Sequence, residues 1–236
     1  MKYVIAPSIL SADFTQLGKD IKETEEGGAA YLHFDVMDGM FVPNISFGIP
    51  VMKSIRKATH QVMDAHLMVQ DPIRYVKAFK EAGADLITVH LEACPDVRKT
   101  LTEIKDLGIM AGLSICPETS VEEIREYLEY VDMILIMSVH PGAGGQKFME
   151  ESLDRIRETR KMIEESGKEI DIQVDGGVKF ENARKILDAG ANILVAGSAV
   201  FGDNIVENTR KFVEIFRARY FSVMPLLSPS TAVRPS

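Results

Sequence analysis

Histidine and aspartate side chains recur near the ends of short apolar runs in this sequence. His33 and Asp35 close one run, His66 lies near the end of the next, and Asp175 follows a later one. Alternation along a strand puts His33 and Asp35 on the same face. A lone strand histidine is more often a hydrogen-bonded core residue, but four such groups would each need a separate buried partner. Two imidazoles and two carboxylates meeting at one point instead predict a site for zinc, iron(II), manganese or cobalt.

Glycine-rich turns supply a second chemical signal. The residues of these turns are Gly142, Ala143, Gly144 and Gly145, then Gly176 and Gly177, and finally Gly197 and Ser198. A phosphate can approach main-chain N–H groups closely where no side chain covers them, and helix N-termini favour the anion further. One such turn would merely permit a tight connection. Three successive turns predict a phosphate site, through which an acidic protein could hold an anion without a lysine cluster.

These residues need a scaffold that brings distant strand ends together. Short β-branched apolar runs alternate with longer amphipathic stretches, and the runs cover residues 4–10, 31–35, 62–68, 86–90, 111–115, 133–137, 170–174 and 193–196. Such runs predict parallel strands covered by helices. Eight repeats favour a single (β/α)8 TIM barrel of the α/β class, whose active sites lie at the C-terminal strand ends. An open doubly wound sheet is the rival, but residues 8–13 lack the glycines of its usual first turn.

Local signals place several helix boundaries. Asp71 followed by Pro72 predicts an N-cap and a first helical residue, and Ser120 with Glu123 predicts a capping box. The last helix is expected over about residues 203–219. We expect the catalytic barrel to occupy residues 1–220, and the Ser/Pro-rich tail at 221–236 to be disordered or non-native.

Composition excludes several classes of function. The chain has 236 residues, a normal length for one barrel, and its net charge of −8 argues against nucleic-acid partners. No apolar run approaches the roughly 20 residues that span a bilayer, so we expect no membrane partner, and we expect no signal peptide because ordered-looking sequence starts at the first residues. The cysteines, Cys94 and Cys116, form no CxxC motif. A reduced, cytoplasmic setting is the simplest interpretation.

Several stretches resemble the ribulose-phosphate 3-epimerase family. They are APSILSADF at 6–14, HFDVMDG at 33–39, FVPN at 41–44, HLMV at 66–69, PGAGGQ at 141–146 and VDGGV at 174–178. The likeness runs from residue 1 to about 219, and the combination is highly specific. Two positions depart from the family: Ala143 stands where a bulky aromatic is usual, and His140 stands where Asn is common.

The resemblance implies roles for individual residues. It implies one divalent metal ion per subunit on His33, Asp35, His66 and Asp175, with Asp35 and Asp175 as the acid–base pair. It implies substrate contacts from Ser8 and His66, a lining of Met37, Met68 and Met137, and phosphate contacts in the glycine-rich turns. From spacing alone the methionines would be core residues and Ser8 could equally be a turn hydroxyl. A homo-oligomer is also implied.

The implied reaction inverts C3 of a ketose phosphate, converting D-ribulose 5-phosphate to D-xylulose 5-phosphate through an enediolate in the pentose phosphate pathway. One alternative is a 3-epimerase of a six-carbon ketose phosphate such as D-allulose 6-phosphate, although the Gly144-Gly145-Gln146 run looks more like the pentose enzyme. Another is a barrel that binds sugar phosphate without turnover. A lyase or aldolase is less favoured because no strand-end lysine is evident for a Schiff base.

Overall fold

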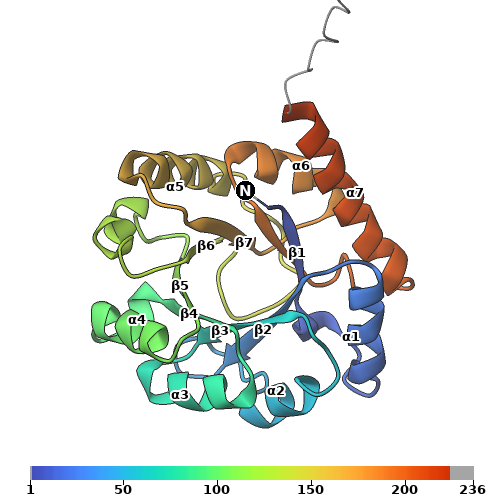
Figure 1. The fold of residues 1–236 in the computed structure, drawn as a ribbon, viewed down its shortest axis with the longest axis horizontal. Helices are drawn as coiled ribbons and strands as arrows, with labels where there is room; N and C mark the ends of the chain where they lie inside the picture. The colour runs from blue at the N-terminus through green and yellow to red at the C-terminus, as the bar shows by residue number, and fades with distance from the viewer. Residues whose placement is uncertain (1, 224–236) are drawn as a thin grey trace, which may run out of the picture.

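The computed structural model describes residues 2–223 and contains one eight-stranded parallel sheet rolled into a barrel (Figure 1). The strands are β1 (Val4–Pro7), β2 (Tyr31–Met37), β3 (Val62–Met68), β4 (Leu86–His90), β5 (Met110–Ile115), β6 (Met133–Met137), β7 (Asp171–Asp175) and β8 (Ile193–Ala196). The α-helices are α1 (Leu17–Glu26), α2 (Ile49–Ile55), α3 (Ile73–Ala82), α4 (Val97–Asp106), α5 (Ser152–Ser166), α6 (Phe180–Ala189) and α7 (Ile205–Val223). Short 3₁₀ helices cover Ile9–Ser11, Leu91–Ala93 and Val121–Tyr127.

The barrel closes between its first two strands. Every other neighbouring pair forms a parallel ladder in the order β1-β8-β7-β6-β5-β4-β3-β2. At the remaining seam, a single parallel bridge joins Ser8, directly after β1, to His33 in β2. The predicted (β/α)8 barrel is therefore confirmed. The closing bridge also brings the Ser8 turn against the strand that carries two of the predicted site residues.

Apolar side chains fill both sides of the barrel wall. Those that face outward, such as Leu32 and Phe34, are fully buried under the helices. A second, smaller cluster of buried side chains is formed by residues of β1, β4, β6 and β8, namely Val4, Ala6, Leu86, Met133, Ile193 and Val195. Because the pleat alternates, the same strands that bury apolar residues outward can point His33 and Asp35 inward. Alternation thus lets one short strand serve both the core and the site.

Several local predictions differ in the structure. The first strand ends at Pro7 and not at residue 10, because the Ser8 hydroxyl accepts a hydrogen bond from the Leu10 N–H and caps a 3₁₀ turn. Asp71 is not an N-cap: it adopts φ 53°, and the helix cap is Pro72. The capping box on Ser120 is confirmed, but it opens a 3₁₀ helix in place of an α-helix.

The last helix, α7, ends at Val223, beyond the boundary expected near residue 220. The rest of the predicted Ser/Pro-rich tail lies outside the described residues. Within the part of the chain that is described, no helix has both the length and the apolarity to cross a bilayer.

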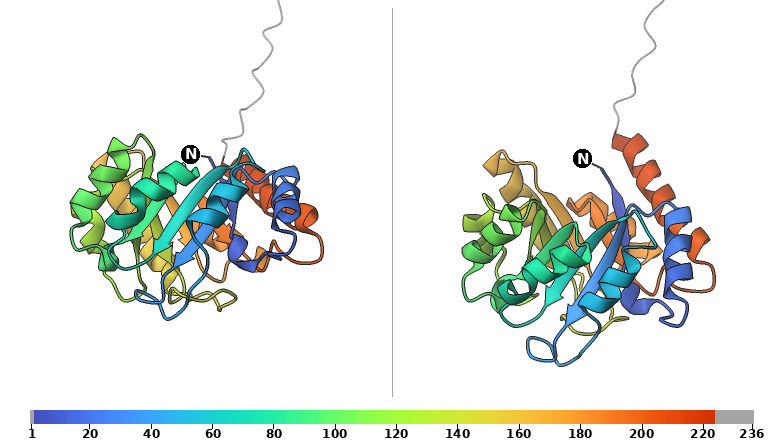
Figure 2. Two further views of the ribbon diagram at one scale, coloured as in Figure 1. Left: turned by 90° about the horizontal axis from the view of Figure 1, so that it is seen from below. Right: turned by 60° about the horizontal axis from the view of Figure 1, so that its bottom comes forward.

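The eight strands are parallel and therefore point toward the same end of the barrel, where the longest connecting loops lie (Figure 2). The loop at 38–48 follows β2, and the loop at 138–151 follows β6; both project from that end. Side chains at the C-terminal strand ends therefore share a mouth that these two loops border.

Candidate active site

The four side chains expected to bind metal lie together at the barrel mouth. His33 and Asp35 come from β2, His66 from β3 and Asp175 from β7, with one ligand atom of each within 4.8 Å of the others. His33 Nε2 lies 3.3 Å from Asp35 Oδ1 and 3.8 Å from Asp175 Oδ2. His66 Nδ1 lies 3.3 Å and 3.6 Å from the same two oxygens. Ligands of a tetrahedral cation with bonds of about 2.0–2.1 Å lie about 3.3 Å apart, so these separations fit a metal.

The orientation of His33 also fits metal binding. Its Nδ1 lies 2.7 Å from Asp64 Oδ2, and Gln173 Nε2 donates to the same oxygen at 2.7 Å. Because a carboxylate only accepts, the His33 proton belongs on Nδ1. Its Nε2 is buried and has no hydrogen-bond partner among the described residues. A buried nitrogen lone pair aimed at two carboxylates is the arrangement that a cation would satisfy.

The two aspartates have opposite acidities. Burial raises the pKa of Asp35, but the neighbouring His33 and His66 side chains outweigh burial and hold that pKa far below its usual range. Burial and the negative charge of Asp35 raise the pKa of Asp175 from 3.8 to about 7, although its side chain is still 15% exposed. Asp35 is thus ionised near neutral pH, whereas Asp175 gains and loses a proton in that pH range.

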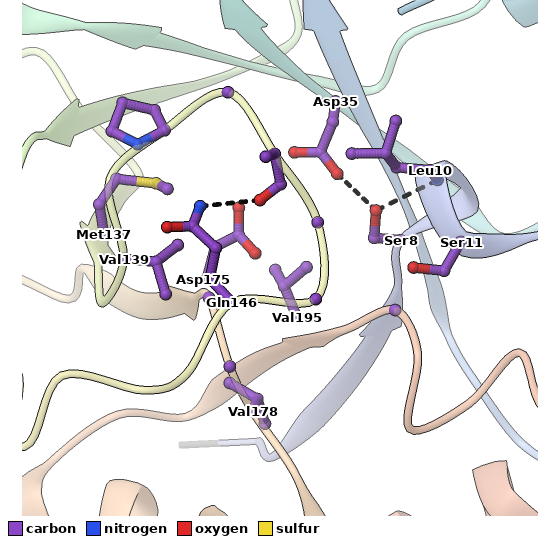
Figure 3. A pocket seen from close by; sticks show the side chains of 18 of the residues that line it. Ser8, Leu10, Ser11, Asp35, Met137, Val139, Gln146, Asp175, Val178 and Val195 are labelled. Carbon is purple, nitrogen blue, oxygen red and sulfur yellow. Dashed lines mark hydrogen bonds between the residues drawn. The ribbon is translucent and has the colours of Figure 1, made fainter.

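A pocket opens above this cluster. Figure 3 shows Asp35 and Asp175 entering it from different sides, with Ser8 beside Asp35 and Met137 beside Asp175. The Ser8 hydroxyl donates to Asp35 Oδ2 and also caps the turn that follows β1, so its interpretation as a turn hydroxyl is confirmed, while its contact with substrate stays a prediction. Met37 and Met68 also line the pocket and pack together in a small apolar cluster.

The glycine-rich turns form another part of the same pocket wall. Gly142, Ala143, Gly144, Gly145, Gly176, Gly177, Gly197 and Ser198 all line it. Gly176 and Gly177 have φ values of 118° and 64°, in the region that favours glycine. A Cβ at Gly177 would collide with the main chain of Phe148, so the absence of a side chain at this position is a packing requirement.

Side-chain amides fix the loop that follows β6. Gln146 Nε2 donates to the main-chain oxygens of His140 at 2.7 Å and Ala143 at 2.9 Å. Asn44, from the loop after β2, donates to the Gly142 oxygen at 3.2 Å. The two loops therefore hold each other at the mouth, and Ala143 contributes only a methyl group to the pocket.

Of the predicted site residues, only His33 and His66 do not line the pocket, since both are fully buried. His140 lines it while its Nδ1 lies 2.8 Å from Glu118 Oε1 at the exposed rim. Asp64 was not predicted from the sequence. Because it precedes His66 by two residues on the same strand, alternation alone places it on the same inward face.

Sequence reasoning also missed His90. Its Nε2 lies 2.9 Å from His66 Nε2, and the two rings stack. The signal was available, because His90 ends a predicted strand next to the one that carries His66. Ser11 and Lys179 are further pocket residues that were not anticipated.

A (β/α)8 barrel with a metal-competent cluster and a glycine-lined pocket at its strand ends has the architecture of a barrel enzyme. Residues 4–201 match the model of the ribulose-phosphate 3-epimerase family. The ribulose-phosphate 3-epimerase of Bacillus subtilis is 49% identical over 201 residues, covering 85% of this chain and 93% of that protein. The enzyme of the same name from Escherichia coli K12 is 48% identical over 201 residues, covering 85% and 89%.

Solved structures agree on the architecture. The 3-keto-L-gulonate-6-phosphate decarboxylase from Vibrio cholerae aligns with a TM-score of 0.70 at 14% identity, covering 92% of this chain and 99% of that one. This similarity supports the barrel alone. The family model and the curated relatives go further: the chain belongs to the ribulose-phosphate 3-epimerase family and is an isomerase.

Proposed function

We propose that this chain inverts C3 of D-ribulose 5-phosphate to give D-xylulose 5-phosphate, the reaction of the pentose phosphate pathway for which its relatives are named. The observation that carries the proposal is the pair of aspartates. Asp35 and Asp175 enter one pocket from different sides, with pKa values displaced in opposite directions. Two carboxylates whose environments separate their pKa values are the usual mark of an acid–base pair.

The C3 hydrogen of a 2-ketose is acidic because the neighbouring carbonyl accepts the charge, which gives an enediolate. Inversion requires that one group removes the proton from one face and another returns a proton to the opposite face. Asp35, ionised and held by Ser8, acts as the base in one direction. Asp175, with a pKa of about 7, carries the proton that is returned, and the roles exchange in the reverse reaction.

We further propose that His33, Asp35, His66 and Asp175 hold one divalent cation per subunit, because their separations and the unpartnered His33 Nε2 fit one. Such a cation would supply Lewis-acid stabilisation of the negative charge that develops at the substrate oxygens. Asp64 orients His33 through the hydrogen bond to Nδ1, and His90 does the same for His66 through Nε2.

The substrate phosphate is proposed to lie against Gly142, Gly144, Gly177, Gly197 and Ser198. This part of the pocket wall lacks large side chains and is built largely of main chain. The open main chain supports binding of a sugar phosphate. Met37, Met68 and Met137 give the remaining wall an apolar character that excludes water from the reacting carbon.

The test compares wild type with Asp35→Asn and Asp175→Asn after loading with manganese, zinc, iron(II) or cobalt. Each variant should lose at least the roughly 10²–10⁴-fold that general acid–base catalysis contributes, while its circular dichroism stays unchanged. Solvent deuterium should enter C3 of the product. Near-normal turnover by either variant, or product without deuterium, would refute the two-aspartate scheme.

The same assay separates the substrate alternatives. We expect kcat/KM for D-ribulose 5-phosphate to exceed that for D-allulose 6-phosphate, and the reverse order would assign the six-carbon reaction. The homo-oligomer and the cytoplasmic setting stay predictions.

A further inference from the structure

We propose that His90, Glu92 and Cys116 form a second metal site, separate from the cluster at the barrel mouth and selective for zinc or a similar borderline cation. Their ligand atoms lie within 4.8 Å of one another, the only other such group found among the described residues. His90 ends β4, Glu92 lies in the 3₁₀ helix that follows, and Cys116 comes directly after β5. Imidazole, carboxylate and thiolate together are a ligand set that suits zinc.

The distances match a tetrahedral ion. His90 Nδ1 lies 3.3 Å from Glu92 Oε2 and 3.6 Å from Cys116 Sγ. Tetrahedral angles on ordinary zinc bond lengths place a nitrogen about 3.3 Å from an oxygen and about 3.5 Å from a sulfur. Both observed separations therefore already have the values that a bound ion would impose.

The ligands are held in place before any ion arrives. Glu92 Oε1 accepts hydrogen bonds from the Cys116 N–H at 2.7 Å and from the Thr119 hydroxyl, which leaves Oε2 directed at His90. Arg155 donates to the main-chain oxygen of Cys116 at 2.8 Å and fixes that segment. The Glu92 side chain is 24% exposed, so an ion has a route from solvent and a water can complete the coordination.

The test is a cobalt(II) titration of the metal-free, full-length protein. A thiolate ligand gives cobalt a near-ultraviolet charge-transfer band that a site of two His and two Asp cannot produce. Wild type should bind two equivalents, one of which carries this band. Cys116→Ala and Cys116→Ser should lose the band and one equivalent while keeping the other equivalent and the wild-type circular dichroism.

Cys94→Ala is the matched control, because Cys94 is the other free thiol, and it should retain the band. A wild type without the band, or a band that survives in both Cys116 variants, would overturn the second site. Because the band reports only on sulfur, this result is independent of turnover and of the first site.

Discussion

Replacing Asp175 by Asn should stabilise the metal-free protein at alkaline pH. The folded protein raises the pKa of Asp175 from 3.8 to about 7 through burial and the charge of Asp35. Each pKa unit is worth 1.36 kcal/mol, so the ionised carboxylate costs the folded state on the order of 4 kcal/mol above pH 7. Asn has a similar shape and no charge, so the variant avoids this cost.

The sign follows from linkage. A group whose folded pKa is raised contributes its full stability below its unfolded pKa and loses it as pH rises through its folded pKa. The variant and wild type should therefore be equally stable near pH 4, and should diverge by about 1.4 kcal/mol per pH unit until about pH 7. For a chain of this size the final difference corresponds to roughly 8–16 °C in Tm.

The assay is thermal unfolding followed by circular dichroism in the presence of a chelator, between about pH 4 and pH 8. Asp35→Asn is the matched control, because His33 and His66 lower the pKa of Asp35 and its anion stabilises the fold. That variant should be less stable than wild type at pH 8. Saturating metal should reverse the effect at position 175, since Asn is a poorer ligand than carboxylate. An Asp175→Asn protein that is no more stable than wild type at pH 8 without metal would refute this account of its acidity.

Three further substitutions test the parts that surround the aspartates. Gly177→Ala should destabilise the protein by more than Gly145→Ala in chemical denaturation. Both glycines have positive φ, but only the methyl group at position 177 would collide with a neighbouring loop. Equal losses in the free energy of unfolding would contradict this. Asp64→Asn should weaken metal binding by about 10–100-fold in a calorimetric titration, because Asp64 fixes the proton of His33, and unchanged affinity would remove that role. Gln146→Ala should raise KM more than it lowers kcat, because it frees two hydrogen bonds that shape the loop; a fall in kcat alone would point to a chemical role.

Local patterns in the sequence were enough to predict the architecture and most of the pocket. Apolar runs with a fixed repeat predicted eight parallel strands, and side chains alternate along a strand for purely geometric reasons. The sequence alone therefore assigns four side chains to the same end of the barrel, namely His33, Asp35, His66 and Asp175. The glycine turns could be placed there too, because a glycine-rich turn after a strand is a local feature.

Only the tertiary structure decided what depends on distances between strands. The Asp71 cap was mispredicted because the conformation of a loop residue depends on the packing around it. The second cluster escaped notice because Glu92 and Cys116 meet His90 from separate connections. The sequence names the titratable groups of the site, but which nitrogen of each histidine faces the metal, and which aspartate is the stronger acid, follow from the atoms that desolvate each group in the fold.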